Sequence, residues 1–288
     1  MKPRRSVIVL LSLVASFALG QSQSEEWSAV EKELGRGGKA QEGVYKVSFP
    51  RTDLAVRIGK TPVEASAGLG SWAAFRKDTS GGITDGDLVL LESEVNGVVS
   101  ALQDHGLEVS AIHNHLLSEI PKVMYVHFFG RGDLSSLAAG IKAALATTKT
   151  PMVTARAASK PALGFDQKMV KGILGKPGNV SGKVLAFAFP RSYGISMHGV
   201  ALPPGMGMAT AINFQGAPGG VAATGDFVLK EPEVNGVISI LRKGGVSVTA
   251  EHNHMLEDEP RTVFLHFWGE GKAEAVAKTL REAVDASK

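Results

Sequence analysis

The chain has 288 residues, with 31 Lys and Arg against 28 Asp and Glu, and it contains no cysteine. This length suits two domains of ordinary size. The lack of cysteine excludes disulfides, thiolate nucleophiles and cysteine-ligated zinc, so any bound metal would be held by His, Asp, Glu or backbone oxygen.

The first 20 residues have the pattern of an export signal. A basic start with Lys2, Arg4 and Arg5 precedes an apolar run from Val7 to Leu19. This run is shorter than the roughly 20 residues that a membrane helix needs, and we expect no transmembrane segment elsewhere. We therefore expect residues 1–20 to be removed and the mature chain to be exported to the periplasm or out of the cell.

The charge of the mature chain is balanced. Without residues 1–20 it has 28 Lys and Arg against 28 Asp and Glu. Sequence-independent binding to nucleic acid depends on a basic surface, so this balance argues against a nucleic-acid partner.

The two halves of the chain repeat each other. Residues 86–132 match residues 225–271 without a gap, with 24 identities in 47 positions. We expect two domains, at about residues 25–150 and 163–288, joined by a segment whose Pro, Ala and Ser content is typical of a linker.

The first half predicts a mixed fold. In chain order we expect a lead helix in "WSAVEKELGRGG", short strands at 44–49, 54–58 and 88–91, a helix at 94–103, strands at 107–116 and 123–129, and a helix at 133–146 that matches 273–284. This order predicts an α+β fold in which helices cover one face of a mostly antiparallel sheet, with a ferredoxin-like core.

Each half carries a short His-Asn-His stretch, "AIHNHLL" at 111–117 and "AEHNHML" at 250–256. Side chains alternate along a strand, so His113 and His115 would share one face. A hairpin centred near residue 120 would bring His127 on the next strand directly across from His113. His252, His254 and His266 have the same offsets in the second half.

Three neutral imidazoles are the usual protein ligands of a catalytic zinc ion, with a fourth position for water or substrate. We therefore predict a divalent-metal site in each half, zinc being the first candidate. The ligands would be His113, His115 and His127 in the first half, and His252, His254 and His266 in the second.

Glu119 and its counterpart Asp258 follow the second His of each stretch by four residues. They are candidates for a fourth ligand or for the general acid or base of a metal-dependent hydrolase. A solvated turn residue at the tip of the hairpin explains them equally well.

Arg51 and Arg191 end the two "FPR" segments and are candidates for binding an anionic ligand. A surface or salt-bridge role is the ordinary alternative for an Arg in this position.

The function stays open at this level. A metal-dependent hydrolase is one hypothesis, and a non-catalytic periplasmic protein that binds a metal or a small ligand is the alternative. A third is purely structural, with the histidines packed and hydrogen-bonded inside the sheet.

The chain resembles the LppY/LpqO family of bacterial exported proteins in "FPRTDLAV", "GDLVLLESEVNGVVSAL" and "HNHLLSEIPKVMYVHFFGRGD". The resemblance covers nearly all of the mature chain, in two copies. It implies an exported protein built on a domain of unknown function, and it leaves the chemistry undecided. The lipoprotein members carry a cysteine for acylation, and this chain has none, so we expect it to be released rather than anchored to lipid.

Overall fold

The computed structural model describes residues 26–153 and 162–287. The expected export signal at 1–20 and part of the expected linker lie outside the described residues. Within the described ranges, no helix has both the length and the apolar character needed to cross a membrane.

The first repeat consists of α2 (Ser28–Leu34), β1 (Lys39–Gln41), β2 (Val44–Pro50), β3 (Arg57–Ile58), β4 (Thr61–Pro62), α3 (Ala65–Gly68), β5 (Gly70–Arg76), β6 (Gly82–Leu91), η1 (Glu92–Glu94), α4 (Val95–Asp104), β7 (Glu108–His113), β8 (Glu119–Ile120), β9 (Val123–Gly132) and α5 (Leu134–Ala146). The second consists of α6 (Gln167–Leu174), β10 (Asn179–Ser181), β11 (Val184–Pro190), β12 (Ile195–Met197), β13 (Val200–Leu202), η2 (Pro204–Met206), β14 (Ala209–Ala217), β15 (Gly220–Leu229), α7 (Glu231–Lys243), β16 (Ser247–His252), β17 (Asp258–Glu259), β18 (Val263–Gly271) and α8 (Ala273–Ala286).

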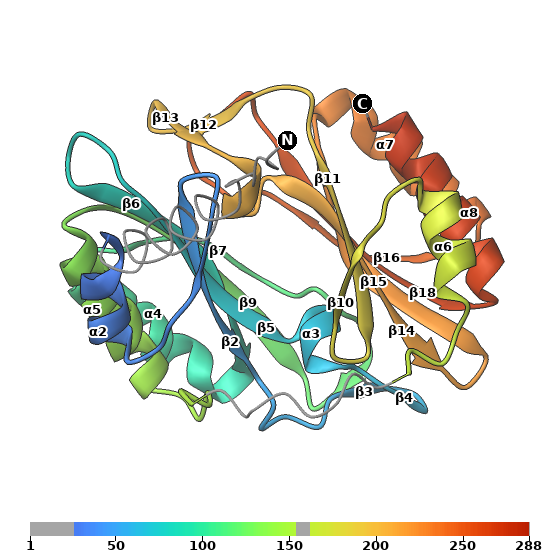
Figure 1. Ribbon diagram of the computed structural model, residues 1–288, viewed down its shortest axis with the longest axis horizontal. Coiled ribbons are helices and arrows are strands. Elements are labelled where there is room, and N and C mark those ends of the chain that lie inside the picture. Colours follow the sequence, from blue (N-terminus) through green and yellow to red (C-terminus); the bar gives the residue numbers. More distant parts are fainter. Residues whose placement is uncertain (1–25, 154–161, 288) are drawn as a thin grey trace, which may run out of the picture.

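Each repeat forms a six-stranded antiparallel sheet, in the order β1-β2-β5-β6-β9-β7 and β10-β11-β14-β15-β18-β16. Helices α2, α4 and α5 lie on the outer side of the first sheet, and α6, α7 and α8 on the outer side of the second (Figure 1). The two sheets thus lie between two helical layers. This confirms the predicted fold of two tandem copies, each an antiparallel sheet with its helices on one face.

One end of each sheet has the split β-α-β arrangement of a ferredoxin-like core. In the first repeat, β9 lies between β6 and β7 and is antiparallel to both, while α4 connects β6 to β7. The strand beside β6 is β5, which precedes this unit in the chain.

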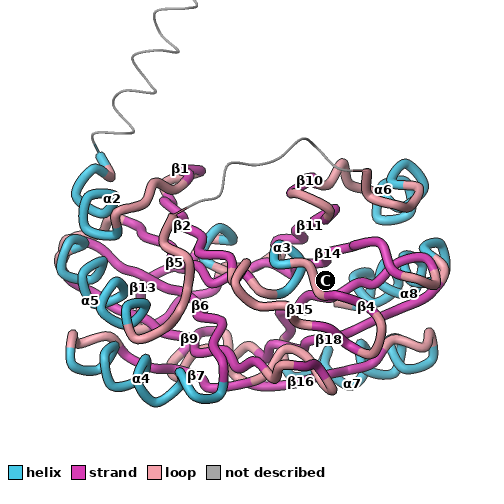
Figure 2. Tube along the Cα trace, turned by 90° about the horizontal axis from the view of Figure 1, so that it is seen from below, coloured by secondary structure: helices cyan, strands magenta, loops and turns pink. Residues whose placement is uncertain are grey.

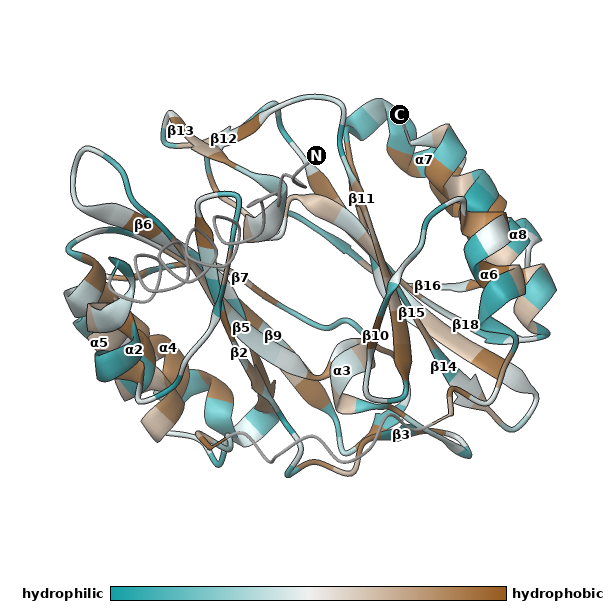
Figure 3. Cartoon of the chain, viewed as in Figure 1, coloured by the Kyte–Doolittle hydropathy of each residue, from teal (hydrophilic) through white to brown (hydrophobic). Residues whose placement is uncertain are grey.

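The outer helices are amphipathic, and in Figure 3 α6, α7 and α8 change between hydrophilic and hydrophobic colours along their length. Each repeat has its own apolar core between helices and sheet, which includes Leu137 and Phe128 in the first repeat and Leu280 and Phe267 in the second. Burial of their apolar faces against the sheet, rather than helix propensity alone, stabilises such short helices.

Two expectations about strands were wrong. The 54–58 segment contains only the two-residue β3, and β6 begins at Gly82, well before residue 88. The Gly-rich segment before residue 88, where no strand was predicted, is part of β6. A Cβ on Gly86 would lie 2.4 Å from the Trp72 carbonyl oxygen, so glycine is what lets β6 and β5 approach closely there.

Hydrogen bonds also connect a short segment of each repeat to the other repeat. Arg76 of the first repeat donates to the Ala201 carbonyl on β13, at 3.0 Å. Gln215 of the second repeat accepts from the Glu64 backbone N–H at 2.9 Å, next to α3. Two apolar clusters lie between the sheets and contain residues of both repeats, for example Phe129 with Phe264 and Tyr125 with Trp268. The inner faces of the sheets are therefore packed against each other.

Candidate functional site

The six histidines that were predicted as metal ligands lie in one cluster between the sheets. Strands β7 and β16 meet along the lower edge of Figure 2, and their ends carry His113 and His252. Three pairs of rings contact each other across the boundary, with centroids 3.5 to 3.9 Å apart: His113 with His252 and His115 with His266 are stacked, and His254 with His127 is tilted. The pairs follow a pseudo-twofold relation, because each repeat contributes equivalent residues in the second and third pair.

The register of the hairpin differs from the predicted one. His127 pairs with Ala111, and His113 pairs with Tyr125, so the hairpin is centred near residue 119 and not near residue 120; a bulge between Val109 and Ala111 lies farther from the turn. A two-residue shift keeps His113 and His127 on the same face of the sheet. His115 follows the end of β7, so its position depends on the turn and not on strand alternation.

Backbone contacts between the repeats fix these turns. The Ser110 hydroxyl donates to the His254 carbonyl at 2.7 Å, and its counterpart Thr249 donates to the His115 carbonyl at 2.6 Å. The side-chain amide of Asn114 adds a bond to the Thr249 carbonyl at 3.0 Å. Each repeat thus positions the second histidine of the other.

Two buried aspartates of β6 complete the cluster. Asp87 Oδ2 lies 3.3 Å from His115 Nε2 and 3.8 Å from His113 Nε2. Asp85 Oδ1 lies 3.0 Å from His127 Nε2, although the two atoms do not have the alignment of a hydrogen bond. The sequence analysis did not single out these acids. The Gly-Asp pair is repeated as Gly86-Asp87 and Gly225-Asp226, but this repeat alone does not show that Asp87 contacts the histidines.

Burial keeps most of the rings neutral. It lowers the pKa of His252 to about 4 and holds the pKa of His113, His254 and His266 far below its usual range. His127 is the exception. Burial opposes its protonation, but the carboxylate of Asp85 outweighs burial and raises the pKa of His127. Neutral imidazoles are the form that binds metal ions.

The second repeat adds a carboxyl group with a raised pKa, that of Asp226, to this region. Burial, together with the nearby charge of Asp87, raises the pKa of Asp226 to about 7. The positive charge of Lys46 lowers the pKa of Asp226 and so opposes this effect. Burial in turn lowers the pKa of Lys46 to about 8. Its ammonium lies 3.6 Å from the centre of a ring of Trp72.

Among the residues that the structure describes, two groups of side chains could hold a metal ion. In each, three ligand atoms lie within 4.8 Å of one another: His113, His252 and His266 in the first group, and Asp87, His113 and His254 in the second. Both groups take residues from both repeats, whereas the sequence analysis assigned a separate set of three histidines to each half. The structure thus brings the predicted histidines together, but in one shared cluster.

Several buried polar atoms of this cluster have no hydrogen-bond partner. They are both carboxylate oxygens of Asp85, Oδ1 of Asp87, Nδ1 of His113 and of His254, and Nε2 of His127. Leaving buried polar atoms unpaired costs roughly 1–3 kcal/mol for each group. A set of imidazole nitrogens and carboxylate oxygens is the kind of donor set that zinc and other divalent transition metals bind.

The two carboxylates proposed as acid or base lie at the hairpin tips, outside these groups. Glu119 Oε1 accepts the backbone N–H of Val123 at 3.3 Å, and Asp258 Oδ2 accepts the backbone N–H of Thr262 at 2.6 Å. Both side chains close the turn that leads into the next strand. Both residues thus have a turn role, but they are buried, at 4% and 9% exposed, whereas the alternative predicted from the sequence was a solvated turn residue.

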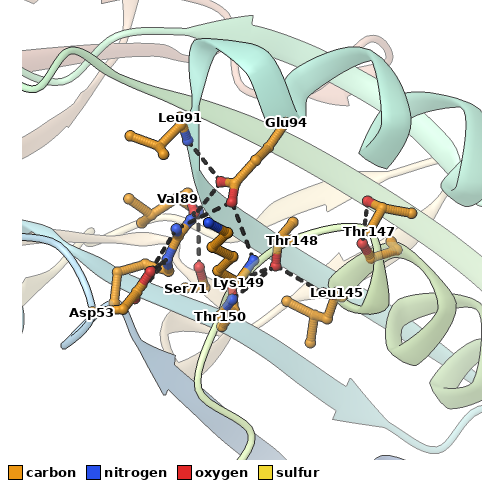
Figure 4. A network of polar contacts seen from close by, with 12 residues as sticks. Asp53, Ser71, Val89, Leu91, Glu94, Leu145, Thr147, Thr148, Lys149 and Thr150 are labelled. Atoms are coloured by element: carbon orange, nitrogen blue, oxygen red, sulfur yellow. Dashed lines mark hydrogen bonds and ion pairs between the residues drawn. The ribbon is translucent and has the colours of Figure 1, made fainter.

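The two arginines lie away from the cluster. Arg51 is fully buried, and its donors bind Asp53, Glu94 and the Val89 carbonyl; these three partners are labelled in Figure 4. A ligand at Arg51 would have to displace one of these groups. Arg191 binds Glu233 at 2.6 Å and lines two cavities of about 340 and 300 Å³.

The chain belongs to a family described as Domain of Unknown Function (DUF1259), whose model matches residues 28–147 and again 168–286. No curated protein matches the chain.

Two solved structures show a distant likeness. One is EtuB from Clostridium kluyveri, with 12% identity over 86% of this chain and 88% of that chain and a TM-score of 0.22. The other is a trimeric bacterial microcompartment shell protein, PduB, with 12% identity over 86% of this chain and 90% of that chain and a TM-score of 0.21. Scores this low support no conclusion about this chain.

Proposed function

We propose that the protein binds one divalent transition metal ion, zinc being the first candidate, between its two repeats. His113, His252 and His266 would be the main ligands, with Asp87 and His254 beside them. The observation that carries the proposal is the convergence of neutral ring nitrogens from both halves next to buried polar atoms that lack partners. The bound ion would join the two halves of the chain.

The proposed setting is the periplasm or the outside of the cell, and the proposed finer family is LppY/LpqO. The basic and apolar N-terminal 20 residues and the His-Asn-His motifs support this proposal. An exported protein that binds metal without catalysis suits the burial of the ligands, since His113, His254 and His266 are each at most 7% exposed.

Metal-dependent hydrolysis is the second candidate, and one observation favours it. The His115 side chain is 18% exposed while it lies 3.3 Å from Asp87, so this ring forms an accessible edge of the cluster. A hydrolytic metal needs a position open to water or substrate.

The first test is the metal content of the purified full chain, measured by inductively coupled plasma mass spectrometry after loading with zinc and desalting. We expect about one equivalent per chain, because the two ligand groups share His113. Two independent histidine sites would give two equivalents instead.

His252→Ala should reduce the bound zinc at least about tenfold, because it removes one of the three rings. The matched control is His105→Ala, since His105 is exposed at the end of α4, bonded to the Ala101 carbonyl. Retention of full zinc by His252→Ala, or an equal loss in both variants, would contradict the proposed ligand set.

Cobalt-substituted protein separates binding from hydrolysis. A closed set of protein ligands predicts a visible spectrum that azide does not change. An azide-dependent change would show an exchangeable position and favour the hydrolase.

A further inference from the structure

The equivalent arginines of the two repeats have different partners. Arg51 donates from Nε and Nη2 to the carboxylate of Asp53, each at 2.9 Å. Arg191 donates from Nη2 to Glu233 and from Nη1 to the Ser287 carbonyl, while its Nε has no partner. The Arg191 side chain is only 3% exposed, so this is a buried, unpaired donor of a charged group.

A substitution between the repeats explains the difference. Two residues after the arginine, the first repeat has Asp53 and the second has Tyr193. The Tyr193 ring centre lies 5.0 Å from the guanidinium carbon of Arg191 and 3.8 Å from Nζ of Lys230. Lys230 itself stands where the first repeat has Leu91. The second repeat has therefore lost an anion at this place and gained a cation.

The Arg191 side chain that carries this donor borders a cavity. The cavity has a volume of about 340 Å³ and is lined by Arg191 and Tyr193, by Arg76 of the first repeat, and by apolar side chains that include Ile195, Leu202 and Met208. This volume lies within the range of small-molecule pockets, which combine apolar walls with a few polar groups.

We propose that the cavity beside Arg191 binds a small carboxylic acid with an apolar body, whose carboxylate takes the position on Nε that Asp53 takes on Arg51.

The chemistry of the site favours a carboxylate over other ligands. The edge formed by Nε and Nη2 of an arginine matches the two oxygens of a carboxylate, and Arg51 shows this pairing inside the same protein. Lys230 and Arg76 add positive charge, while Glu233 is the acid already paired with Arg191. The apolar wall would accommodate the rest of the ligand. This site is separate from the histidine cluster and does not depend on the proposed metal.

Benzoate is the probe, with benzyl alcohol as its uncharged control, titrated into the metal-free full chain by isothermal calorimetry. We expect benzoate to bind in the millimolar range or tighter and benzyl alcohol to bind at least about tenfold more weakly, because the alcohol cannot form a charge-assisted hydrogen bond with the guanidinium. Equal binding of the two compounds, or no benzoate binding up to about 10 mM, overturns the proposal.

Tyr193→Asp is the decisive variant. It rebuilds the pair seen in the first repeat and should fold, and its own carboxylate should weaken benzoate binding at least about tenfold. Tyr193→Phe keeps the ring, adds no charge and should retain binding within about threefold. Circular dichroism checks that both variants are folded. Undiminished benzoate binding by Tyr193→Asp would contradict the assignment of the carboxylate to Arg191.

Discussion

At the scale of single residues, the buried pair of Arg51 and Glu94 links stability to pH. The side chains are 0% and 10% exposed, and Arg51 Nη1 lies 2.7 Å from the Glu94 carboxylate. Burial opposes the ionisation of Glu94, but its hydrogen bonds with Arg51 and with the backbone outweigh burial and lower its pKa. A carboxyl with a lowered pKa stabilises the fold above its unfolded pKa of about 4.3, and this contribution disappears as the pH falls through the folded pKa.

Glu94→Gln should therefore cost about 2 kcal/mol near pH 7 and less near pH 3. Urea denaturation between pH 7 and pH 3 measures this difference. The control is Glu92→Gln, an exposed neighbour in the same turn. If wild type and Glu94→Gln differ by the same free energy of unfolding at every pH in this range, the pair of Arg51 and Glu94 is not the source of the pH dependence.

The histidines could be found from the sequence because the same spacing occurs twice. The acids could not be found by the same reasoning, since Asp85 has Thr224 as its counterpart and is not repeated. Asp87 is repeated, but its importance depends on His115 and His254, which come from different repeats. Spacing along one strand shows which face a residue occupies, and it does not show what packs against that face.

At the scale of elements, a repeated glycine lets the central strands of each sheet approach. A Cβ added to Gly225 on β15 would lie 1.9 Å from the carbonyl oxygen of Ala211 on β14. Contact this close requires the backbone to move.

Gly225→Ala should lower the free energy of unfolding by about 3 kcal/mol, because overpacking forces β15 away from β14. Gly236→Ala is the matched control in the same repeat: it lies in α7 with nothing within 4 Å, so alanine should be neutral or stabilising. Thermal denaturation followed by circular dichroism compares the two. Similar melting temperatures for the two variants would rule out steric conflict at Gly225.

The predicted helices at 94–103 and 133–146 agree with α4 and α5 to within a residue. Both helices could be predicted because the spacing of apolar residues and the Gly or Asp residues at helix ends depend only on nearby sequence. Asp133, for example, caps α5 by accepting the Ser136 N–H at 2.8 Å. The strands were harder, since β5 has small residues where β-branched ones would be expected. The hairpin between β7 and β9 is also centred one residue earlier than predicted, and this changes the register on which the predicted histidine geometry depended.

At the scale of the whole molecule, the two repeats should unfold together. They share two apolar clusters, and Ser110 and Thr249 connect the repeats through their backbone contacts. Separating the halves would expose residues such as Phe129 and Phe264, which are now buried between them.

Urea unfolding of the full chain should therefore give one transition, with tryptophan fluorescence and far-ultraviolet circular dichroism coincident. Trp27 reports on the first repeat and Trp268 on the second. Zinc at about 100 times its dissociation constant should shift this single transition upward by about 2.7 kcal/mol. Two separate transitions, or a shift of only one of them, would show that the repeats are independent.

The pseudo-twofold arrangement of the cluster has a consequence for how such a protein can diverge. In an assembly of two identical chains, every substitution would appear on both sides of the axis at once. When the two copies are joined in one chain, a substitution can change one half alone. One half can then have an acid where the other half has a different residue. The exchange of Asp53 for Tyr193, and of Asp85 for Thr224, illustrates this freedom: ancestral symmetry supplies the scaffold, and its local loss gives each half a different chemistry.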